Sequence, residues 1–134
     1  MTRSLWILIW RWNGQWLDAE FSRVEIHGSR PLHPGRFLTF VKEGWRGIIR
    51  AHGQVRIASQ PGSYRVWSQA GRVGVLGSKM SSTIEEWRQD LTLVGASEAC
   101  IEACHNLEQS LLTDEEIELG PRLWRSFIDP FKEE

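Results

Sequence analysis

Net charge and cysteine are both scarce in this sequence, and each shortage argues against a class of protein. Sixteen Lys and Arg residues are balanced by seventeen Asp and Glu residues, so the formal net charge at pH 7 is −1. Such a balance provides no long-range field to attract nucleic acid or an anionic membrane. Two cysteines, Cys100 and Cys104, are too few for a disulfide framework, which favours a reducing compartment. We therefore expect a cytoplasmic protein without nucleic-acid or membrane partners.

Long hydrophobic runs are absent as well. The apolar run at residues 5–10 ends at Arg11, and no small-residue cleavage site follows it, which is unlike a secretory signal peptide. The run is also too short to span a bilayer. A chain of 134 residues is predicted to form one domain, residues 1–134, with its own hydrophobic core.

Motifs for nucleotide binding and for nucleophilic catalysis are missing. The stretch "GVLGSK" at residues 74–79 differs from a P-loop, because Ser78 separates Gly77 from Lys79 and no helix pattern follows. No serine lies in a G-x-S-x-G elbow. Cys104 and His105 are neighbours in a helical pattern, where adjacent side chains point in different directions. We therefore expect neither nucleotide binding nor an enzymatic activity.

The N-terminal part of the chain predicts a Trp-rich β-hairpin extension at residues 1–20. Residues 5–12 form an apolar, β-rich run. Asn13 and Gly14 can supply the two positive φ angles of a type I′ turn. The return strand would then run over residues 15–21.

A helix is predicted to begin at Pro34, because proline is well tolerated in the first turn. His33 would lead into this helix. Phe37, Phe40 and Val41 recur at three- and four-residue spacing and would form its buried face.

Strands and a second helix are predicted farther along the chain. The strands lie within residues 47–59, 63–77 and 87–95, and the last of them would close the sheet. Ser97 is predicted to cap a helix that runs from Glu98 to about residue 112. The apolar stripe of this helix consists of Cys100, Cys104, Leu107 and Leu111.

The C-terminal part carries clear signals for two short helices. Thr113 and Glu116 have the spacing of a capping box. Gly120 can end the first helix with a positive φ, and Pro121 can begin the second. The second helix would dock through an apolar face of Leu123, Trp124 and Phe127.

A metal site is the alternative interpretation of the helix at residues 98–112. Cys100 and Cys104 share one helix face, and His105 follows them, so zinc or cobalt would find thiolate and imidazole ligands. A closed site needs further ligands, and His27, His33 and His52 are the available histidines. The other interpretation is that both cysteines are small buried hydrophobes.

Five segments together resemble one family, the C-terminal domain of the CobW GTPases. This is a metal-chaperone group that is linked to cobalt, zinc and nitrile hydratase metal handling. The resemblance covers residues 21–131. Its motifs, in order, are "RPLHPGRF" (30–37), "IIRAHG" (48–53), "VWSQAG" (66–71), "RQDLTLVG" (88–95) and "LLTDEEIELGPRLWRSFIDPF" (111–131).

The resemblance implies an α+β fold, an antiparallel or mixed β-sheet with helices mainly on one face. In the family this domain is non-catalytic, packs against the GTPase domain and helps to recognise the client that receives the metal. The P-loop and the Cys-rich metal motif of the family's GTPase domain do not occur in this sequence, and Ser110 replaces a common cysteine.

The resemblance also suggests partner-binding residues and a function. The candidates for partner contact within the matched motifs are Arg30, His33, Arg50, Trp67 and Gln69. Trp67 could equally be a core residue. We expect a non-catalytic module that binds a GTPase or a metalloprotein client in metal-ion trafficking. The alternatives are a small metal-binding protein and a folded remnant of a longer CobW-type GTPase.

Overall fold

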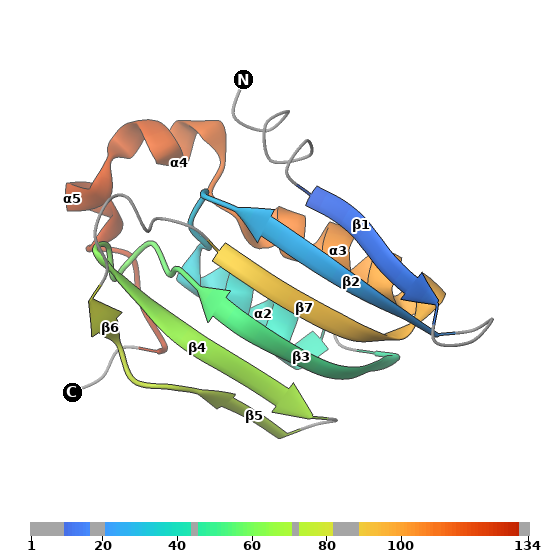
Figure 1. The fold of residues 1–134 in the computed structure, drawn as a ribbon. Coiled ribbons are helices and arrows are strands. Elements are labelled where there is room, and N and C mark those ends of the chain that lie inside the picture. The colour runs from blue at the N-terminus through green and yellow to red at the C-terminus, as the bar shows by residue number, and fades with distance from the viewer. Residues whose placement is uncertain (1–9, 17–20, 44–45, 71–72, 82–88, 132–134) are drawn as a thin grey trace.

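An antiparallel β-sheet forms one layer of the molecule and is seen face-on in Figure 1. The computed structural model describes residues 10–16, 21–43, 46–70, 73–81 and 89–131. Within these residues the sheet has seven strands in the order β1-β2-β7-β3-β4-β5, and β6 also pairs with β4. The strands are β1 (Trp10–Trp16), β2 (Phe21–Gly28), β3 (Ile48–Val55), β4 (Ser63–Ala70), β5 (Val73–Leu76), β6 (Met80–Ser81) and β7 (Gln89–Ala96).

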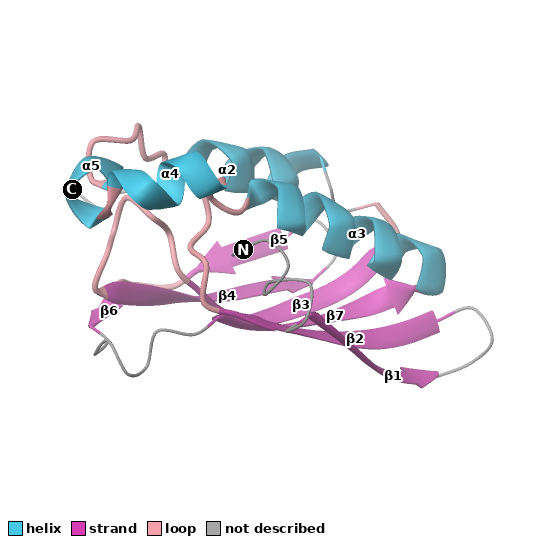
Figure 2. Ribbon diagram, turned by 90° about the horizontal axis from the view of Figure 1, so that it is seen from above, coloured by secondary structure: helices cyan, strands magenta, loops and turns pink. Residues whose placement is uncertain are grey.

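The helices lie on one face of this sheet (Figure 2). The described helices are α2 (Pro34–Glu43), α3 (Ser97–Ser110), α4 (Asp114–Leu119) and α5 (Pro121–Trp124). α3 packs on β2 and β7, and α2 lies beside α3. The predicted α+β fold with helices on one face is therefore confirmed. Among the described residues, no helix is long and apolar enough to cross a membrane.

The sheet has one buried face and one open face. Burial alternates at every second residue along β2, β4 and β7, as expected when side chains point to opposite faces of a strand. The inward side chains meet the apolar stripes of α2 and α3 in a single core. That core includes Val24, Ile26, Phe37, Phe40, Trp67, Leu91, Leu93, Cys100, Cys104 and Leu107.

Trp67 is a central ring of this core. Its side chain is 2% exposed. The ring lies edge-on to Phe37, with centroids 5.5 Å apart and planes at 84°, and also contacts Phe40 at 6.1 Å. Edge-to-face contacts of this kind add to the stabilisation from burial alone. Trp67 is therefore a packing residue that joins β4 to α2.

The N-terminal hairpin differs from the prediction in the position of its turn. β1 runs through Asn13 and Gly14, and β1 pairs with β2. The register shifts between Arg11 and Gln15, so Asn13 and Gly14 lie at an irregularity inside the strand, where glycine commonly marks a bulge. The turn prediction was wrong because pairing with β2 continues on both sides of these residues, at Arg11 and at Gln15. The expected strand at residues 5–12 lies partly outside the described residues.

Two further expectations need correction. Ser97 does not cap α3 with its side chain; its hydroxyl lies 2.6 Å from the hydroxyl of Ser22 in β2, and Ala96 takes the capping position. β7 does not close the sheet at an edge but lies between β2 and β3. The chain therefore returns to the middle of the sheet for its last strand, which no local signal in residues 87–95 indicates.

Candidate functional site

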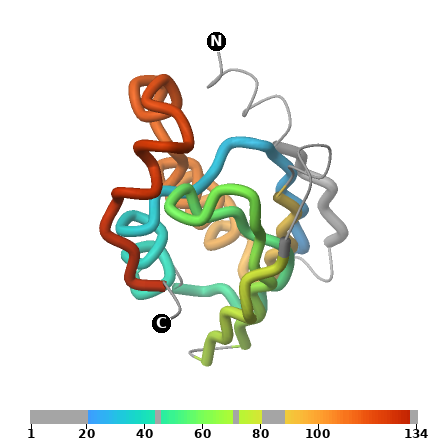
Figure 3. The backbone as a smooth tube through the Cα atoms, turned by 90° about the vertical axis from the view of Figure 1, so that its left-hand side faces the viewer, coloured from blue at the N-terminus to red at the C-terminus, as the bar shows by residue number. Residues whose placement is uncertain are grey.

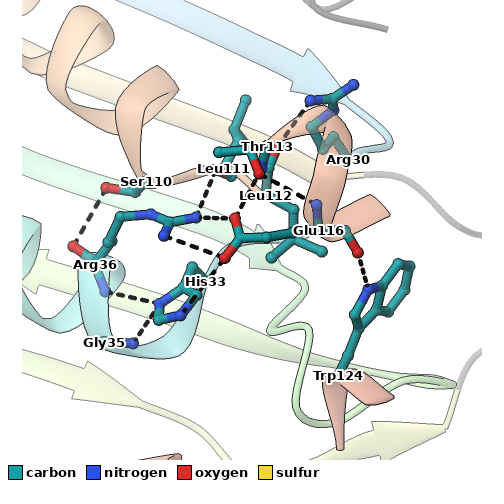
Figure 4. A network of polar contacts seen from close by, with 10 residues as sticks. All are labelled: Arg30, His33, Gly35, Arg36, Ser110, Leu111, Leu112, Thr113, Glu116 and Trp124. Carbon is teal, nitrogen blue, oxygen red and sulfur yellow. Dashed lines mark hydrogen bonds and ion pairs between the residues drawn. The ribbon is translucent and has the colours of Figure 1, made fainter. Parts of the chain in front are cut away.

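The start of α2 and the start of α4 are joined by a network of polar side chains (Figure 4). Thr113 and Glu116 form the predicted capping box: the Thr113 N–H donates to Glu116 Oε1 at 2.8 Å, and the Glu116 N–H donates to Thr113 Oγ1 at 3.2 Å. The guanidinium of Arg36 donates to the same carboxylate and to the Leu111 carbonyl at 3.1 Å. Glu116 therefore holds α4 against α2.

His33 supplies the side-chain cap of α2. Its Nδ1 accepts hydrogen bonds from the backbone N–H groups of Gly35 at 3.1 Å and Arg36 at 3.3 Å. The ring centroid lies 5.1 Å from that of Phe127, and Nε2 lies 3.9 Å from Glu116 Oε2. Because Nδ1 accepts from two N–H groups, it must be unprotonated. His33 therefore links the helix start to the C-terminal segment as a neutral imidazole.

Burial and charge set the protonation states in this network. Burial is the main cause that lowers the pKa of His33, the Arg36 charge lowers it further, and Glu116 acts in the opposite direction. Burial alone would raise the pKa of Glu116, but hydrogen bonds from Arg36 and from the Thr113 N–H, together with the Arg36 charge, leave it below its usual value. The network thus favours a neutral His33 beside an ionised Glu116.

Arg30 holds the same junction from the end of β2. Its side chain is 9% exposed, and it donates to the Leu112 carbonyl at 2.7 Å and to Asp114 Oδ1 at 2.8 Å. The Trp124 indole N–H donates to the Glu116 carbonyl at 2.6 Å. The first and the last of the five sequence motifs therefore meet in space, as Figure 3 shows for the C-terminal segment beside the start of α2.

The C-terminal segment is fastened at its end as well. Asp129 accepts hydrogen bonds from the Ser59 hydroxyl at 2.6 Å and the Gln60 amide at 2.8 Å. Gly120 has the positive φ of 82° that the prediction required, and Pro121 begins α5. Trp124 is buried and Phe127 is partly buried, but Leu123 is 48% exposed, so Leu123 does not belong to the docked face.

The five candidate partner-binding residues do not form one surface. Arg30 and His33 lie at the junction described above. Trp67 and Gln69 are buried on the helix side of β4. Arg50 is exposed, and its strand neighbours are Ala70 and Val94.

The three candidate metal ligands do not converge either. Cys100 and Cys104 are buried in the core, and the Cys100 thiol lies 3.7 Å from the Ser22 carbonyl oxygen. Burial raises the pKa of the Cys100 thiol, although a backbone hydrogen bond at Gly95 acts against this, and a raised pKa disfavours the thiolate that binds metal. His105 is exposed, with Nε2 at 3.1 Å from the Gln109 amide nitrogen. In the described part of the chain, no three His, Cys, Asp or Glu side chains gather as metal ligands.

A groove between α2 and β5 was missed by the sequence reasoning. It has a volume of about 1040 Å³, and Gln69 and Trp67 lie in its wall. Gly74 in "VGVLG" was the one available signal, because a glycine inside a strand often marks a close approach of another chain. The groove depends on the distance between α2 and β5, which the sequence pattern does not contain.

Comparison with known proteins decides the family. A family model described as the cobalamin synthesis protein CobW C-terminal domain matches residues 21–109, which is more than half of the chain. The chain belongs to this family. The match to this CobW C-terminal domain includes the first four motifs and ends before the segment that begins at Leu111.

Relatives of this CobW C-terminal domain carry names from zinc handling. The chain is 23% identical over 140 residues to a zinc chaperone of Mycobacterium tuberculosis, and the alignment covers 85% of this chain and 35% of the relative. It is 26% identical over 133 residues to zinc-regulated GTPase metalloprotein activator 1 of Dictyostelium discoideum, covering 77% of this chain and 28% of the relative. The chain thus spans about a third of the length of the curated relatives it matches.

A solved structure shares the fold. The crystal structure of the Zn(II)-bound YjiA GTPase from E. coli aligns with 66% of this chain and 30% of its own length, at a TM-score of 0.50 and 12% identity. A Zn(II)-bound triple mutant of that GTPase gives a TM-score of 0.51. At this identity the likeness shows the fold alone.

Proposed function

We propose that this CobW C-terminal domain is a non-catalytic module that binds a protein partner in metal-ion trafficking. The partner is a GTPase of the same family or a metalloprotein that receives the metal. The observation that carries this proposal is the family match over residues 21–109 in a sequence that holds no P-loop. The names of the relatives make zinc the first metal to consider.

The predicted metal ligands give little support to the metal-binding alternative. The two thiols are buried in the core, and His105 is exposed. The polar network of Arg36, His33 and Glu116 is used to hold α4 against α2. Arg50 is the one member of the predicted partner set that is exposed, and we propose it as a contact residue on the open face of the sheet.

Affinity capture tests the proposal directly. The full chain is immobilised and exposed to an extract of the source cells, and bound proteins are identified by mass spectrometry. We expect a CobW-type GTPase or a zinc-dependent enzyme to be enriched over a column that carries the heat-unfolded chain. Enrichment of neither class would contradict the proposal, as would GTP hydrolysis by the purified chain alone.

A further inference from the structure

The groove between α2 and β5 has an apolar floor and is open to solvent. Phe37 and Trp67 line it from the core, and Leu76 lines it from β5. Leu38 and Val41 line it from α2, and Phe131 of the C-terminal segment lies near its floor with its ring 5.5 Å from that of Phe37. A volume of about 1040 Å³ can hold several side chains of a ligand.

β5 is an edge strand in the described sheet, and part of its backbone points outward. The Gly77 N–H donates to the Val66 carbonyl at 2.8 Å. Because hydrogen-bonded and non-hydrogen-bonded pairs alternate in an antiparallel ladder, Val75 and Val73 direct their backbone groups toward β4. Gly74 and Leu76 then direct theirs away from the sheet. The Leu76 carbonyl accepts a hydrogen bond from the Arg65 guanidinium at 3.5 Å. By the ladder register, the N–H groups of Gly74 and Leu76 face the edge.

Gly74 lies against the side chain of Gln69 beside this edge. In the β4–β5 register Gly74 is opposite Gln69, so it lies on the groove side of β5. A Cβ atom built on Gly74 would lie 2.9 Å from Gln69 Oε1, which is closer than ordinary contact allows. The Gln69 amide therefore lies over Gly74, in the space that a side chain would occupy.

Two cations lie at one end of the groove. Lys42 and Arg46 are exposed and line it where α2 ends, and Glu43 is the acidic residue among the described lining residues. This end therefore has a small excess of positive charge, which favours an acidic side chain in a ligand.

We propose that the groove binds an extended segment of the partner protein, which pairs with β5 as an added strand. Alternate apolar side chains of the segment enter the groove, and an acidic side chain lies beside Lys42 and Arg46. Strand addition of this kind derives affinity from main-chain hydrogen bonds and specificity from pockets for alternate side chains. The proposal rests on the proposed function, since it names the part of the partner that is recognised.

A second copy of this chain fits the edge less well. β5 is four residues long. Edge-to-edge pairing of two such strands would bury far less than the roughly 1,000 Å² that a stable protein interface needs.

The test uses a display library of random nine-residue peptides, selected on the full-length chain. We expect the enriched peptides to have apolar residues at alternate positions and to carry an acidic residue.

Two variants of the chain test the edge and the charge. Gly74→Pro removes one outward N–H without removing a bond to β4, and Lys42→Glu reverses an exposed charge. Each should weaken peptide binding by about tenfold or more. Arg122→Glu, an exposed charge reversal on α5 outside the groove lining, should leave binding unchanged. Thermal unfolding of each variant shows whether it is folded.

Several results would overturn the inference. One is a selection without enriched peptides, and another is equal binding to the chain and to a folded Lys42→Glu or Gly74→Pro variant. A concentration-dependent dimer that Gly74→Pro abolishes would assign the edge to a second copy. If affinity capture recovers a GTPase or a metalloprotein equally well with folded Gly74→Pro, the proposed function stands and the groove inference fails.

Discussion

Replacing Trp67 by Ala separates a core role from a role in partner contact. The ring is 2% exposed and lies edge-on to Phe37. An indole side chain buries about 150–250 Å², and at about 25 cal/mol per Å² this burial contributes about 4–6 kcal/mol. Alanine retains part of that area, while the cavity left under α2 adds a further cost. We therefore expect the free energy of unfolding to fall by about 3–5 kcal/mol.

Urea unfolding monitored by circular dichroism measures this change. The neighbouring substitution Val66→Ala is a matched control, because Val66 is 48% exposed on the other face of the same strand; its effect should stay within about 0.5 kcal/mol. A loss below about 1 kcal/mol for Trp67→Ala, together with lost partner binding, would refute the packing argument and make Trp67 a contact residue.

Other predictions concern local features of the same structure. The pKa of His33 is lowered in the folded chain. The stability that His33 contributes is therefore complete above about pH 6.5 and decreases as the pH falls through that value toward the folded pKa. His33→Asn should flatten this part of a curve of unfolding free energy against pH. Gly53→Ala should prevent folding or lower the free energy of unfolding by more than about 3 kcal/mol, because its Cβ would lie 1.9 Å from the Asp90 carbonyl oxygen. Gly62→Ala, where a Cβ atom meets open space, should lower it much less in the same urea assay. Arg50→Ala should change stability by no more than about 0.5 kcal/mol yet weaken partner capture, and equal capture would remove Arg50 from the interface. Native mass spectrometry of the chain purified without chelators should give the bare mass, and a bound zinc ion would reopen the cysteine site.

The sequence correctly predicted the local structure at the starts of α2 and α4. Pro34 begins α2, and Thr113 and Glu116 form the expected capping box, because such caps depend on residues three or four positions apart. The strands predicted within residues 47–59, 63–77 and 87–95 correspond to β3, to β4 and β5, and to β7. The resemblance to the CobW C-terminal domain then implied how these elements combine, as an α+β fold.

Long-range arrangement was the part that the sequence did not reveal. Asn13 and Gly14 have the composition of a turn, yet pairing with β2 keeps them in β1. Arg30 and Glu116 meet at one junction only because segments far apart in the sequence pack together. The groove beside Gly74 depends on such packing as well. Neither is encoded in a spacing that can be read along the chain.

Isothermal titration of the full chain with the purified captured protein measures the proposed partner binding itself. The proposal that this CobW C-terminal domain recognises a GTPase or a metalloprotein predicts saturable binding with a Kd on the order of 1 μM, or about −8 kcal/mol. It also predicts no GTP turnover by the chain alone. The absence of binding heat across several temperatures, for the GTPase and for the metalloprotein alike, would contradict it.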